Sequence, residues 1–89
     1  MAYVSITLEE HGKQYKNYLH QAEISSGIKK EMHRHAFGGM EADQQEALDM
    51  IAVKISHILN GTPDYSDNWR DIAGYATLVA ERLDGNERE

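Results

Sequence analysis

The sequence predicts an all-α fold, a small helical bundle that self-association completes. Apolar residues recur at helical spacing through the C-terminal half, and no pair of segments alternates as paired strands would. Turn-forming residues at positions 38–39 and 60–61 separate the helical segments. The 89 residues are expected to form one domain, 1–89, and they contain no cysteine. Neither a disulfide nor a thiolate metal site can therefore reinforce a core this small.

The N-terminal half is predicted to be the weaker helical part. Thr7 and Glu10 form a capping box, which indicates that a short helix begins there, and Gly12 weakens this helix. A longer helix is then expected over residues 17–35, ended by the glycine pair at 38–39. Its imperfect apolar stripe consists of Leu19, Ala22, Ile24, Ile28 and Met32.

The clearest helix is predicted over residues 43–60. Asp43 and Glu46 form a second capping signature at its start, and Asn60-Gly61 supplies a left-handed C-terminal cap. Its apolar residues follow the spacing of one helix face, and they are Leu48, Ile51, Ala52, Ile55, Ile58 and Leu59.

The final helix is predicted over residues 67–84, starting near Ser66 or Asp67 and ending before Gly85. Its apolar stripe, which is expected to face the core, consists of Trp69, Ile72, Ala73, Ala76, Val79, Ala80 and Leu83. A short loop joins it to the preceding helix, so the two strong helices should form an antiparallel hairpin. Their stripes exceed what the N-terminal half can cover, so a homo-oligomer, a dimer or an assembly of dimers, is expected.

Charge argues against a nucleic-acid duplex as a partner. The net charge is −6, with 15 acidic residues against 9 lysines and arginines, whereas a duplex binder needs a basic face. Lys29, Lys30 and Arg34 nevertheless cluster beside His33 and His35. Two interpretations stay open for this cluster: a site for a small phosphate ligand, or a solvated helix face.

The sequence gives no sign of a membrane partner. No apolar run has the length of a transmembrane helix, and no charged-then-apolar leader opens the chain. We therefore expect a soluble protein that acts in the cytoplasm.

Four acids are candidates for binding a ligand or a metal. Glu46 and Asp49 share one helix face, and Asp67 and Asp71 share a face of the next helix. In an antiparallel hairpin the two pairs lie about 20 Å apart, so a single site needs a crossing angle, a second subunit or a folded-back loop. Helix capping explains Glu46 and Asp67. Asp71 lies past the capping positions, which favours a binding role, and Asp49 either binds or faces water.

Five further side chains suit a phosphate or a base. Lys54 lies among apolar neighbours in mid-helix, where it either extends to solvent or neutralises an acid or a phosphate. Arg70 offers a planar fork for phosphate or carboxylate. Tyr65, Trp69 and Tyr75 are close enough in sequence to form an aromatic wall, although Trp69 also belongs to the stripe expected to face the core.

The stretch EALDMIAVKISHILNGTPDYSDNWRDIAGYATLVAERL, residues 46–83, resembles a family of small phage and prophage proteins of unassigned function. The match extends weakly back to HGKQY, residues 11–15. More distantly, the chain is similar to the all-α nucleotide pyrophosphohydrolases of the MazG and dUTPase type. Those enzymes hold magnesium with an ExxE pair on one helix and an ExxD pair on the next, usually in a site completed across a dimer.

The resemblance implies a MazG-like domain with an altered acid set. Glu46-x-x-Asp49 matches the first pair, and Asn68-x-x-Asp71, with Asp67 adjacent, matches the second. An amide thus replaces a carboxylate at position 68, which weakens a magnesium site that needs hard oxygen ligands.

The N-terminal part of the match also lacks an acid that the resemblance implies. Around Tyr15 the sequence reads QYKNY, which places Lys16 and Asn17 where the resemblance implies a small residue and an acid. Lysine and amide groups still hold phosphates and base edges, so these changes favour ligand binding over hydrolysis.

The resulting hypothesis is a phage-type protein, acting in the cytoplasm of a bacterial host, that binds and sequesters a nucleotide such as a host immune signal and needs no cofactor. The first alternative is a magnesium-dependent nucleoside triphosphate pyrophosphohydrolase, and the second is a helical interaction protein without a small ligand. The ligand-binding residues would be Tyr15, Lys16, Lys29, Lys30, Arg34, Lys54, Asn68, Arg70, Asp71 and Tyr75. The metal ligands of the first alternative would be Glu46, Asp49, Asp67 and Asp71.

Overall fold

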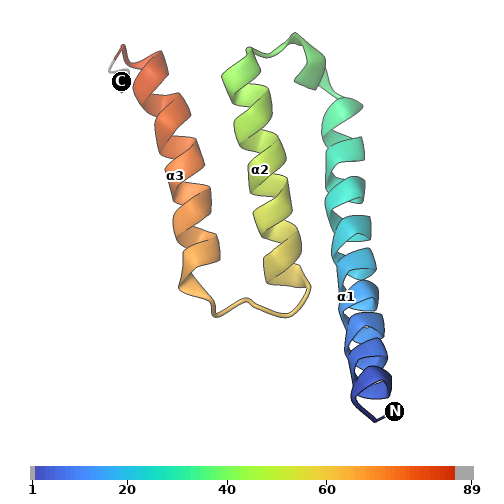
Figure 1. The fold of residues 1–89 in the computed structure, drawn as a ribbon. Coiled ribbons are helices and arrows are strands. Elements are labelled where there is room, and N and C mark those ends of the chain that lie inside the picture. Colours follow the sequence, from blue (N-terminus) through green and yellow to red (C-terminus); the bar gives the residue numbers. More distant parts are fainter. Residues whose placement is uncertain (1, 86–89) are drawn as a thin grey trace.

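A computed structural model of the chain describes the backbone of residues 2–85 and the side chains of residues 17–85. Its elements are α1 (Ala2–His33), the short 3₁₀ helix η1 (Ala36–Gly39), α2 (Ala42–Leu59) and α3 (Ser66–Leu83) (Figure 1). No strand occurs within the described backbone, so the prediction of an all-α fold is confirmed. No helix in this part of the chain has the length and apolar character needed to cross a membrane.

The three long helices lie side by side in one layer. α2 is the middle helix, with α1 on one side and α3 on the other, and consecutive helices run antiparallel (Figure 1). The radius of gyration is 17.1 Å, whereas a compact domain of this length has about 12 Å. The N-terminal turns of α1 extend past the α2–α3 loop and contribute to this open shape (Figure 1).

α1 corrects the expected division of the N-terminal half. The structure has one continuous helix through Gly12, not a short helix followed by a longer one over 17–35. A single glycine inside a helix costs only about 1 kcal/mol relative to alanine, which the remaining turns outweigh. The capping box expected at Thr7 and Glu10 falls inside this helix, and both side chains lie outside those the structure describes.

The start of α2 differs from its predicted signature. Glu41 is the N-cap residue, and it forms a capping box with Gln44, whose Oε1 accepts a bond of 3.0 Å from the Glu41 N–H. Asp43, expected to cap the helix, points instead to Arg82 of α3, which contacts it through two guanidinium nitrogens. The C-terminal turn follows the prediction, since Gly61 has a φ of +119°.

The α2–α3 loop is fixed by side chains from α3. Asn68 is buried, and its amide donates to the hydroxyl of Thr62 at 3.2 Å. The Trp69 indole N–H donates to the Pro63 carbonyl at 2.9 Å. Trp69 is 55% exposed, so its expected place in the core is wrong. Trp69 lies on a side of α3 that does not face α2, together with Ala73, Ala76, Ala80 and Leu83, which are also exposed although they were expected to face the core.

The buried apolar core within the described side chains is small. It consists of Phe37, Ala47 and Ala52. Phe37, which the sequence analysis did not single out, lies on η1 with its ring 4.2 Å from that of His33. The larger aliphatic side chains of α2 remain at least partly accessible to solvent.

Candidate functional site

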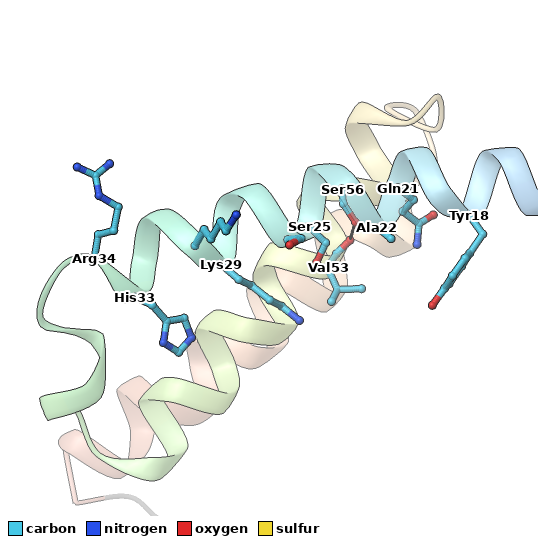
Figure 2. A pocket seen from close by; sticks show the side chains of 11 residues that line it. Tyr18, Gln21, Ala22, Ser25, Lys29, His33, Arg34, Val53 and Ser56 are labelled. Atoms are coloured by element: carbon cyan, nitrogen blue, oxygen red, sulfur yellow. Dashed lines mark hydrogen bonds between the residues drawn. The ribbon is translucent and has the colours of Figure 1, made fainter.

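A groove of about 640 Å³ runs between α1 and α2, and we name it the α1–α2 groove (Figure 2). Val53 and Ser56 form its α2 side. Its α1 side carries most of the polar groups, which belong to Tyr18, Gln21, Ser25, Ser26, Lys29 and Lys30. The spacing of these residues by three or four places them along one side of α1.

The two lysines of the groove have no carboxylate partner among the side chains that the structure describes. Lys29 is half-buried and extends from α1 to the α2 side of the groove (Figure 2), while Lys30 is exposed. Each of the other described lysines and arginines forms an ion pair, and these pairs are Arg34–Glu31, Lys54–Asp71, Arg70–Asp67 and Arg82 with Asp43 and Glu41. The groove therefore holds the uncompensated positive charge of this part of the chain.

Arg34, a third member of the basic cluster, is engaged on α1 itself. Its guanidinium donates to Glu31 at 2.8 Å and points away from α2 (Figure 2). His35 contacts the second oxygen of the same carboxylate at 3.0 Å. Arg34 thus borders the groove, but the structure does not direct its charge into it.

A second cluster of predicted residues meets between α2 and α3. The ammonium of Lys54 lies 2.9 Å from the carboxylate of Asp71, and this hydrogen bond raises the pKa of Lys54 against the opposing effect of burial. A hydrogen bond to Asp67 likewise raises the pKa of Tyr65. The phenolic groups of Tyr65 and Tyr75 also act on the Lys54 ammonium. Lys54 and Asp71 are therefore in direct contact, and Tyr75 lies close enough to affect the pKa of Lys54.

Two other predicted ligand residues have local partners. Arg70 forms an exposed ion pair with Asp67 at 3.2 Å, one turn apart on α3. The amide of Asn68 is occupied by its bond to Thr62 and only 4% of the residue is exposed. Asn68, the position matched to a metal-binding carboxylate, is thus part of the loop anchor.

The four candidate metal ligands do not come together as one group among the described side chains. Glu46 lies near Arg82, at the end of the hairpin opposite the loop, whereas Asp71 lies beside Lys54. Eight residues separate Glu46 from Lys54 along α2, which corresponds to about 12 Å. Asp49 has one carboxylate oxygen that is buried without a hydrogen-bond partner. Among the side chains described, no three histidines or acids approach closely enough to share a metal ion.

The remaining predicted residues, Tyr15 and Lys16, have side chains outside the described range. Conversely, sequence reasoning missed Tyr18, Ser25 and Ser26 as groove residues. Their signal was their helical spacing from Lys29, which places them on the same side of α1.

Comparison with known proteins gives a family but no activity. No curated protein and no solved structure matches the chain. A family model matches residues 6–83, from within α1 to the end of α3. Its description names neither a ligand nor a reaction. The chain belongs to this family, which is described as a domain of unknown function (DUF6378).

Proposed function

We propose that this protein binds a small phosphate-containing ligand, a nucleotide, in the α1–α2 groove and holds it chemically unchanged. The observation that carries the proposal is that Lys29 and Lys30 have no acid partner among the described side chains, in a protein whose net charge is −6. Both lysines line the same groove without an acid, and a bound phosphate would offer each ammonium group charge-assisted hydrogen bonds.

The rest of the groove suits the other parts of a nucleotide. The hydroxyls of Ser25 and Ser26 and the amide of Gln21 can donate and accept hydrogen bonds, as a sugar requires. Tyr18 is 64% exposed, which leaves its ring face available for stacking with a base. The volume of 640 Å³ also falls within the range typical of small-ligand sites.

The arrangement of acids supports sequestration more than hydrolysis. Asp71 is paired with Lys54 on the α3 side of α2, and Glu46 lies at the far end of that seam. Hydrolysis by a metal-bound water requires ligands gathered around the reacting phosphate. In a single chain, the α1–α2 groove is lined by Lys29 and Lys30 instead. As the resemblance to phage proteins implies, the proposed ligand belongs to the class of host signalling nucleotides, and the protein acts in the host cytoplasm.

The test is calorimetric titration with ATP, ADP-ribose and cyclic di-AMP, each with magnesium and with chelator, followed by denaturation and analysis of the released ligand. We expect at least one of the three to bind in the presence and absence of magnesium and to be recovered intact. The double variant K29A/K30A should bind it at least about tenfold more weakly, because charged hydrogen bonds are each worth about 1.5–3 kcal/mol.

The control is R34A, which removes one positive charge from the next turn of α1, whereas the double variant removes two. Its guanidinium points away from the groove, so affinity should change by less than about threefold, the effect of one distant charge. Equal losses in R34A and K29A/K30A would contradict a defined phosphate site. Release of pyrophosphate in many-fold excess over protein would contradict sequestration and favour the hydrolase.

A further inference from the structure

The α3 helix carries two parallel stripes, and only one of them faces α2. The inner stripe includes Asn68, which is buried, and Arg82, which contacts Asp43 of α2. The second stripe follows the inner one by one residue in the sequence, and all of its side chains are exposed. It consists of Trp69, Ala73, Ala76, Ala80 and Leu83. These positions are separated by three or four residues, so they form one continuous apolar side of the helix.

α2 continues this apolar surface. A groove of about 440 Å³ between the helices joins Leu48 and Ile51 of α2 to Ala76 of α3. Ile55 and Leu59 follow at the same spacing, and Leu59 is 64% exposed. We use the name apolar face for the exposed α3 stripe together with four residues of α2. These four are Leu48, Ile51, Ile55 and Leu59.

We infer that a second copy of this chain packs on the apolar face, so that two helical layers meet face to face in a homodimer. Helices with an apolar face need a second layer against which to bury it. All residues of the apolar face are uncharged, and a neutral surface can pack on a copy of itself about a twofold axis. The alanines at its centre let the two backbones approach, with Trp69 and Leu83 towards the ends of α3.

The accessible area is large enough for an interface with a second copy. The chain exposes 6810 Å², whereas a compact protein of its 10.1 kDa mass exposes about 5,300 Å². A stable interface buries about 800 Å² on each partner. The difference of about 1,500 Å² exceeds the area that one such interface buries on each partner.

This dimer does not depend on the proposed ligand. Val53 and Ser56, which border the α1–α2 groove, lie on a different side of α2 from Ile51 and Ile55. The groove therefore remains open when the apolar face is covered.

The test combines sedimentation equilibrium with the fluorescence of Trp69, the single tryptophan of the chain. At micromolar concentration we expect twice the 10.1 kDa mass of one chain. Dilution should shift the Trp69 emission to the red, because dissociation returns the indole to water. In A76R the dissociation constant should rise at least about a hundredfold, since an arginine at the centre would be buried without a partner.

The matched control is T77R, which places the same charge on the next residue of α3, outside the apolar face. It should remain a dimer. A monomeric unmodified chain, a dimeric A76R, or a monomeric T77R would each overturn the inference, because each would mean that no copy is bound there. If A76R does not fold, the dilution series of the unmodified chain decides alone: a concentration-independent emission contradicts the dimer.

Discussion

The layer has two helix–helix contacts, the α1–α2 seam and the α2–α3 seam. They differ in how their charged side chains are paired. Between α2 and α3, Lys54 lies 2.9 Å from Asp71, and Arg82 is held by acids at the far end. Between α1 and α2, Lys29 and Lys30 have no acid partner among the described side chains, and a groove lies beside them. A paired charge holds helices together, whereas an unpaired charge is available to a ligand. We therefore expect the α2–α3 seam to be structural and propose the α1–α2 seam for binding.

The largest effect is expected for N68D, a substitution at the residue that anchors the α2–α3 loop. Thr62 donates its hydroxyl hydrogen to the His57 carbonyl, so it can only accept a bond from Asn68. In N68D a buried carboxylate would face this oxygen without a donor. We expect the free energy of unfolding to fall by about 2–4 kcal/mol, measured by urea denaturation. An unchanged midpoint would mean that Asn68 does not anchor the loop.

A moderate effect is expected for the Lys54–Asp71 pair at high pH. The hydrogen bond to Asp71 raises the pKa of Lys54 above its ordinary value of 10.5. The folded chain thus holds this proton more tightly than the unfolded chain does. The pair stabilises the fold below pH 10.5, and this contribution is lost as the pH rises through the higher pKa of the folded state.

The measurement is thermal unfolding of the unmodified chain and of D71N at pH 8 and at pH 11.5. At pH 8 the substitution should cost about 0.5–1 kcal/mol, as expected for a pair with substantial exposure. At pH 11.5 the difference should shrink. The pKa of Tyr65 is raised mainly by its hydrogen bond to Asp67, so its ionisation also lowers stability with rising pH in both proteins. A difference that grows with pH would contradict the assigned pair.

The smallest effect is expected for D67A. Asp67 is not the N-cap residue of α3, which is Tyr65, and its ion pair with Arg70 is exposed. Its loss should cost about 0.3–1 kcal/mol, mostly through the helix dipole. A loss of about 2 kcal/mol by urea denaturation would indicate that Asp67 caps the helix after all.

The sequence predicted the helices better than the contacts between them. The stripes of α2 and α3 fixed the helical segments, because they depend on local spacing alone. The N-cap Glu41 was missed because glutamate is not among the preferred capping residues. Trp69 was placed in the core because a stripe shows that a face is apolar without showing whether this chain covers it. Phe37 gave no periodic signal in its glycine-flanked loop.

For the candidate site too, local features were predicted from the sequence and contacts between helices were not. Lys29 and Lys30 were found from their adjacency in the chain, which is a local property. The pairing of Lys54 with Asp71 joins two helices, and residue types alone left open whether Lys54 meets an acid, a phosphate or solvent. The position of Asn68 was open for the same reason, since a buried loop anchor and a ligand-binding amide look alike in sequence.

The most direct test of the contrast between the seams compares K29M with K54M. Each variant replaces one ammonium with an unbranched apolar side chain of similar length, and each changes the net charge equally. The measurement is the affinity for the tightest of ATP, ADP-ribose and cyclic di-AMP, by calorimetric titration. We predict at least about a tenfold loss in K29M and less than about threefold in K54M. An equal or larger loss in K54M would contradict the account and place the ligand at the α2–α3 seam.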